Sequence, residues 1–145
     1  MQEVIKFYSE SGNYGEFSNF SNYQVKLKNK IWKTSEHYFQ AQKFESKSYQ
    51  DKIANALTPM KAAELGRSRK EKIKMNWDNL KDNVMYEVIK AKFTQHETLR
   101  NLLVETNDAI IIEHTENDNY WGDGGDGKGK NRLGKILMKV REELK

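Results

Sequence analysis

Short helices with recognisable caps dominate the pattern of this sequence. A helix is predicted over residues 34–43, because a Thr-Ser pair can cap it and Glu36 lies favourably in its first turn. Thr58 and Pro59 suit the cap and the first helical position of a second helix. Apolar residues at helical spacing predict the helices at residues 60–65, 78–91, 99–103 and 131–144. Such a chain must bury several short apolar stripes against one another.

Strands are predicted where β-branched and aromatic residues gather. Residues 4–8 and 23–27 flank a turn-rich segment near the N-terminal end and favour a small antiparallel sheet. Residues 109–113, Ala-Ile-Ile-Ile-Glu, are too short and too β-branched to prefer a helix and are predicted to form a buried strand. We therefore expect an α+β fold that is predominantly helical and has a small antiparallel sheet.

Length and composition restrict the class of protein. A chain of 145 residues fits one domain over residues 1–145, since it is short for two independent cores. The absence of cysteine excludes disulfides and thiol nucleophiles and favours the cytoplasm. Neither a signal peptide nor an apolar run of about 18 residues is present, so a soluble protein without membrane association is expected. The net charge of +4 suits an anionic ligand, but a solvated surface explains it equally well.

One predicted helix face carries groups suited to acid-base chemistry. Glu36, Gln40 and Lys43 are spaced at i, i+4 and i+7, whereas Phe39 and Phe44 are expected to point elsewhere. In a cleft with aromatic walls, burial would raise the pKa of Glu36 and lower that of Lys43. A proton donor and an amine nucleophile would then be available near neutral pH. An ordinary solvent-exposed helix face has the same spacing.

A glycine-rich segment at residues 121–130 precedes the last predicted helix. Five of the nine glycines fall within eight positions there, and backbone amides before a helix N-terminus can bind phosphate. Lys128, Lys130 and Arg132 would add positive charge. The segment matches neither a Walker loop nor a dinucleotide-binding fingerprint, and a flexible surface loop is the alternative. No metal-ligand spacing is present, so neither a resident metal nor another cofactor is expected.

Four blocks of unusual composition follow one another along the chain. They are FYSESGNYGEFSNF, WKTSEHYFQAQKF, KMNWDNLKDNVMYEVIKAKFTQH and EHTENDNYWGDGGDGKGKNRLGKILM. In these blocks, and over nearly its whole length, the chain resembles the NADAR family, also called YbiA-like. The resemblance implies an N-glycosidase that acts on a ribosylamino-pyrimidine phosphate of riboflavin biosynthesis or on ADP-ribosylated guanine, including that in DNA or RNA. Both substrates join ribose C1 to an exocyclic amine near a phosphate.

The resemblance also implies a catalytic group and two modes of attack. Glu36 corresponds to the family's catalytic glutamate. In one mechanism Glu36 or Asp123 positions water while another group protonates the leaving amine, as in two-carboxylate glycoside hydrolysis. In the other, which we favour slightly, Lys43 forms an imine at C1 that water resolves, with Glu36 moving protons.

Further residues are candidates for substrate contact. Trp77 either packs as a hydrophobic staple or forms a stacking platform for a base, and the resemblance favours the second role. The turn-rich segment at residues 9–22 is expected to cover the ligand. The full set of candidate contacts is Phe7, Tyr8, Asn19, Phe20, Gln40, Trp77, Trp121, Gly122, Gly124, Lys128, Lys130, Asn131 and Arg132. Phe7 and Tyr8 equally suit core strand positions.

A different class of function fits the same residues. A non-catalytic module could bind ADP-ribose or nucleic acid through a basic groove lined with aromatic residues. Glu36 distinguishes an N-glycosidase from a non-catalytic binder, because a protein that only binds anions gains nothing from a buried glutamate beside its ligand.

Overall fold

The computed structural model describes residues 2–145, which form helices and short strands. In chain order these are β1 (Val4–Phe7), the 3-10 helix η1 (Gly15–Phe17), β2 (Val25–Leu27), β3 (Lys30–Trp32), α1 (Ser35–Gln42), α2 (Lys47–Ala54), α3 (Pro59–Leu65), α4 (Trp77–Gln95), α5 (Glu97–Val104), β4 (Ile110–Glu113) and α6 (Arg132–Leu144). Within this described part of the chain, no helix has the length and apolar character needed to cross a membrane.

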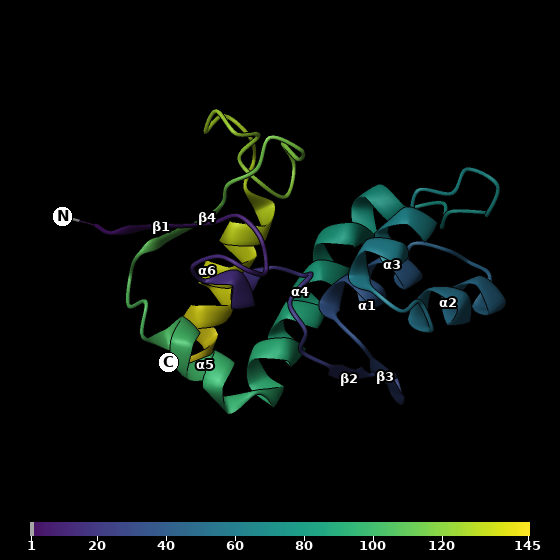
Figure 1. The fold of residues 1–145 in the computed structure, drawn as a ribbon, viewed down its shortest axis with the longest axis horizontal. Helices are drawn as coiled ribbons and strands as arrows, with labels where there is room; N and C mark the ends of the chain where they lie inside the picture. The colour runs from purple at the N-terminus through teal and green to yellow at the C-terminus, as the bar shows by residue number, and fades with distance from the viewer. Residues whose placement is uncertain (1) are drawn as a thin grey trace.

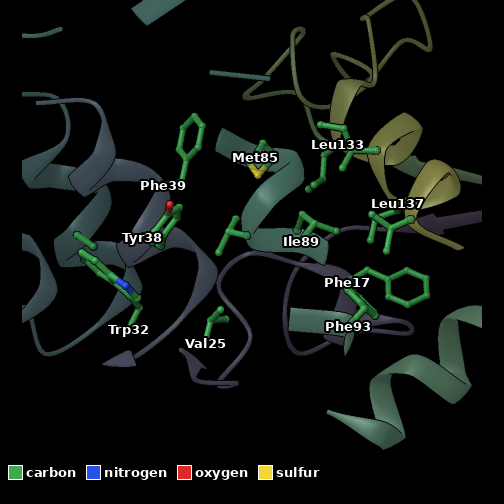
Figure 2. Packing of buried hydrophobic residues seen from close by; sticks show 14 of the residues in the cluster. Phe17, Val25, Trp32, Tyr38, Phe39, Met85, Ile89, Phe93, Leu133 and Leu137 are labelled. Carbon is green, nitrogen blue, oxygen red and sulfur yellow. The ribbon is translucent and has the colours of Figure 1, made fainter. Parts of the chain in front are cut away.

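The long helix α4 passes through the middle of the molecule (Figure 1). Helices α1, α2 and α3 lie on one side of it, and β1, β4, α5 and α6 lie on the other. Figure 2 shows how the core follows this order, with Met85 and Ile89 of α4 between Tyr38 of α1 and Leu137 of α6. Helix α4 therefore connects the two halves of the chain through one continuous apolar core.

The predicted helix caps are confirmed. The Thr34 side chain accepts a hydrogen bond from the His37 amide at the start of α1, and Thr58 accepts one from Lys61 at the start of α3. Helix α2 was not predicted, although Ser46 caps it in the same way. Only its last two residues are buried, so α2 lacks the apolar repeat by which the other helices are recognised.

The strands pair differently from the prediction. The antiparallel sheet consists of β2 and β3, with Val25 opposite Trp32. Strand β1, predicted to join it, pairs instead in parallel with β4, which lies more than 100 residues further along the chain. The buried side chains of Ile5 and Phe7 on β1 pack on the same side of the sheet as Ile111 of β4. The prediction missed this pairing because turn-forming residues indicate only which strands are neighbours in sequence. The predicted α+β class, predominantly helical with a small antiparallel sheet, is confirmed.

Candidate active site

Glu36 lies in the first turn of α1 and is only 8% exposed. Its backbone amide donates to the carbonyl of Asn19 at 3.2 Å, and its carboxylate accepts a 2.8 Å hydrogen bond from Gln40 Nε2. Burial raises the pKa of the carboxyl from 4.5 to about 7, against the opposing effects of the Gln40 hydrogen bond and the Arg67 charge. Glu36 can therefore give up or take a proton near neutral pH.

Gly66, directly after α3, packs against the same face of α1. A Cβ atom at this position would overlap the amide group of Gln40, so glycine is needed for the close approach. The carbonyl of Gly66 also accepts a 2.8 Å hydrogen bond from Lys43 Nζ. The end of α3 thus positions both polar neighbours that follow Glu36 along α1.

Lys43 stands at the C-terminal end of α1 and is half-buried. Burial lowers the pKa of its amine, and the nearby charges of Arg69 and Lys81 lower it further. These interactions increase the fraction of neutral amine, which is the form that can attack a carbon atom. The structure places Glu36, Gln40 and Lys43 along α1 as their spacing predicts, with the Lys43 amine directed to Gly66.

Three aromatic rings pack together where α1, α4 and the glycine-rich loop meet. The ring of Phe39 is 5.3 Å from that of Trp77 and 5.3 Å from that of Trp121. Trp77 is the first residue of α4, and Trp121 belongs to the glycine-rich loop between β4 and α6, seen at the top of Figure 1. Phe39, three residues after Glu36 on α1, is buried and contacts both tryptophans.

Asp123 is 4% exposed and fully engaged within its own loop. One carboxylate oxygen lies 2.7 Å from His114 Nδ1, and the other accepts hydrogen bonds from the amides of Thr115 and Gly125. Burial alone would raise its pKa, but these hydrogen bonds outweigh burial and lower it. These bonds tie Asp123 to its loop, and its catalytic role stays a prediction.

Backbone amides at the start of α6 are used within the protein. The first two amides of the helix donate to the carbonyls of Tyr120 and Trp121, each at 3.0 Å. The amide of Asn131 donates to the carbonyl of Gly122, and the Asn131 side chain bonds to the backbone of β4. These bonds fasten the loop to α6, so these three amides are not free to bind an anion.

Several other predicted contacts lie elsewhere. Phe7 is completely buried against Phe17, so its predicted contact with substrate was wrong. Asn19 is buried and holds Ser35 beside Glu36 through a 2.8 Å hydrogen bond. Phe20 lines a shallow hollow of about 480 Å³ formed by residues 10–23, which does not include Glu36.

The remaining candidates sit at the outer side of the loop. The Tyr8 side chain is exposed and lies against the ring of His114. Arg132 forms a 2.9 Å ion pair with Asp82. Gly124 is partly exposed, and Lys128 and Lys130 are exposed. Glycine at 124 is favoured by its left-handed backbone, with φ of 73°.

The structure adds charged residues that the sequence reasoning missed. The Arg67 charge acts on Glu36, and those of Arg69 and Lys81 act on Lys43. The Arg-Ser-Arg-Lys run at residues 67–70 was the available signal. Asp118 and Glu113 supply further negative charge close to Glu36. Within residues 2–145, no group of three or more histidine and acidic side chains is arranged to hold a metal.

The chain is similar to known proteins over nearly its whole length. The model of the NADAR domain matches residues 6–145. N-glycosidase YbiA of Escherichia coli K12 is 53% identical over 141 residues, covering 97% of this chain and 88% of that protein. A riboflavin biosynthesis protein of Vibrio vulnificus is 39% identical over 144 residues, covering 99% of this chain and 39% of that protein. The NMR structure of E. coli YbiA superimposes with a TM-score of 0.92 over 99% of this chain and 86% of that one, at 53% identity.

Proposed function

This chain belongs to the NADAR domain family and is an N-glycosidase, and we propose that it cleaves the bond between ribose C1 and an exocyclic amine of a phosphorylated substrate. The observation that carries this proposal is the buried Glu36 carboxyl, whose pKa is raised to about 7. An amine is a poor leaving group until it is protonated. A carboxylic acid that keeps its proton near neutral pH supplies that proton.

Cations beside the two reactive side chains support an anionic substrate. Arg67, Arg69 and Lys81 come from the segment after α3 and the start of α4, and their charges reach Glu36 or Lys43. Because the amides at the start of α6 are occupied, side-chain cations are the better candidates for phosphate binding.

The aromatic rings support a planar leaving group. Phe39, Trp77 and Trp121 pack on one another, and Trp121, the partly exposed ring of the three, is the one that a heterocycle can reach. Stacking of one base on an aromatic side chain is worth roughly 1–3 kcal/mol. A pyrimidine bearing a ribosylamino phosphate and a guanine bearing ADP-ribose both present such a ring. The name of the Vibrio relative, a riboflavin biosynthesis protein, favours the first substrate. The second class includes guanine in DNA or RNA.

Two chemical routes are compatible with these residues. In direct hydrolysis, Glu36 protonates the departing nitrogen and water adds to C1. In the imine route, the Lys43 amine adds to C1 of the opened sugar, the exocyclic amine leaves, and water releases the sugar. The lowered pKa of Lys43 supports the second route, whereas its hydrogen bond to Gly66 must be exchanged before attack.

The test compares two substrates side by side. Purified protein and the Glu36→Gln variant are incubated with a guanine-ADP-ribosylated oligonucleotide and with the ribosylamino-pyrimidine phosphate, and released products are measured. Wild-type protein should cleave at least one, and the variant should lose about 10²–10⁴-fold in rate. Cleavage of neither, with ADP-ribose still bound, would contradict the proposal in favour of a non-catalytic binder.

Borohydride reduction separates the two routes. It should trap a covalent sugar adduct on the wild-type protein and none on Lys43→Ala if the imine forms. Full activity of Lys43→Ala would exclude the imine route while leaving the role of Glu36 intact.

A further inference from the structure

Glu113 is an acidic residue on the core-facing side of a strand. It ends β4, where Ile111, two residues earlier, is completely buried. Side chains two apart on a strand point to the same face. The register confirms this placement, because Glu113 pairs with Phe7 and Ile111 pairs with Ile5, all on the inward side of the sheet. A carboxylate at such a position is costly unless it has a partner or a function.

The Glu113 side chain has no partner of its own. Its backbone amide bonds to Asn131 and its carbonyl to the Asp123 amide, but its carboxylate makes no hydrogen bond or ion pair within residues 2–145. The neighbouring acids are used differently. Asp123 accepts hydrogen bonds from the amides of Thr115 and Gly125, and Asp118 accepts those of Tyr120 and Trp121. Glu113 alone among these acids keeps both carboxylate oxygens free of protein donors.

Glu113 is linked to the part of α1 that carries Glu36 through the glycine-rich loop. The Asp123 amide donates to the Glu113 carbonyl at 2.9 Å, and Trp121, two residues before Asp123, packs on Phe39, which follows Glu36 by three residues on α1. Burial, together with the negative charges of Asp118, Glu36 and Asp123, raises the pKa of Glu113 to about 7. Glu113 can therefore accept a proton near neutral pH.

We propose that Glu113 is the second catalytic carboxyl group, the base that activates the attacking water while Glu36 protonates the leaving nitrogen. This assignment rests on the proposed N-glycosidase function. It holds for both routes, because each ends with water adding to the former C1 centre.

The step balances as a hydrolysis. Glu36 donates its proton to the exocyclic nitrogen, the C1–N bond breaks, and the bonding pair leaves with the amine. Ionised Glu113 takes one proton from water, and the water oxygen forms the new bond to C1. The products are the free amine and a sugar with a hydroxyl at C1. Transfer of the proton from Glu113 back to Glu36 restores the pair.

The first experiment measures Glu113→Gln on whichever substrate the wild-type protein cleaves. The variant should lose about 10²–10³-fold in kcat with folding intact by circular dichroism. Glu116→Gln, which changes an exposed acid of the same loop, is the matched control and should keep the wild-type rate.

The pH-rate profile distinguishes a base from a structural side chain. Wild-type activity should fall on both sides of neutrality, since Glu113 must be ionised and Glu36 protonated. Glu113→Gln should lose the acidic limb and keep the alkaline limb, which reports the loss of the Glu36 proton. An unchanged bell-shaped profile would overturn the proposal.

Azide rescue provides an independent measurement. Azide attacks carbon without giving up a proton, so it should restore product formation in Glu113→Ala as a glycosyl azide, but not in Glu36→Ala. A wild-type rate in Glu113→Gln, or a slow Glu113→Ala that azide does not restore, would overturn the role of Glu113. Either result would leave the proposed N-glycosidase function unchanged, because that function is contradicted only if the wild-type protein cleaves neither substrate.

Discussion

The substitution Glu36→Gln should abolish activity and at the same time stabilise the protein at alkaline pH. Glu36 is buried, and its pKa is about 7 in the folded chain compared with 4.5 as an exposed group. At about 1.4 kcal/mol for each pH unit, this difference corresponds to roughly 3 kcal/mol. Burying the ionised carboxylate therefore lowers the free energy of unfolding by this amount. Glutamine has the same shape and no charge, so its burial lacks this cost.

The direction of the pH dependence follows from linkage. Because the folded pKa is raised, the stabilising contribution of protonated Glu36 is fully present below pH 4.5 and is lost as pH rises through about 7. Between pH 5 and pH 8 the wild-type protein should lose roughly 2–3 kcal/mol relative to Glu36→Gln. Removal of the Glu36 charge also lowers the cost of ionising Glu113, which adds to the effect in the same direction.

Urea unfolding at the two pH values measures this difference. The free energy of unfolding of Glu36→Gln minus that of the wild type should be roughly 2–3 kcal/mol more positive at pH 8 than at pH 5. Glu116→Gln provides the control for a general loss of negative charge. If the difference between Glu36→Gln and wild type is the same at both pH values, Glu36 does not carry a raised pKa and the argument for its role as acid fails.

Three other substitutions test separate parts of the structure. Arg67→Ala should raise KM about tenfold with a smaller change in kcat, because a charge-assisted contact to phosphate is worth roughly 1.5–3 kcal/mol; an unchanged KM would exclude that contact. Gly122→Ala should lower the free energy of unfolding by about 1–3 kcal/mol in thermal melts, since its Cβ would lie 2.7 Å from Thr115 and 2.8 Å from the Glu113 carbonyl. Gly12→Ala, which meets nothing within 4 Å, is its control and should be neutral. Lys92 is buried, and burial lowers its pKa from 10.5 to about 7, so the unfolded chain binds more protons between these values. Wild-type stability should therefore rise relative to Lys92→Met between pH 7 and pH 10, and a parallel pH dependence would contradict the lowered pKa.

Local interactions made the helices and one face of the site predictable from sequence. The caps Thr34 and Thr58 act on amides three residues away, so their effect is visible in the sequence itself. The spacing of Glu36, Gln40 and Lys43 follows from the pitch of a helix in the same way. The family resemblance supplied the glutamate, because spacing alone does not separate a catalytic face from a solvated one.

Contacts between distant segments decided the rest. The parallel pairing of β1 with β4 and the packing of Trp121 on Phe39 each join residues more than 70 positions apart. Tertiary structure also ties Asp123 to His114 and pairs the first amides of α6 with carbonyls of the glycine-rich loop, which the sequence of this segment did not indicate. Periodicity and caps report the preferences of neighbouring residues, whereas burial, and with it the pKa values on which catalysis depends, arises only when separate elements exclude water from the same place.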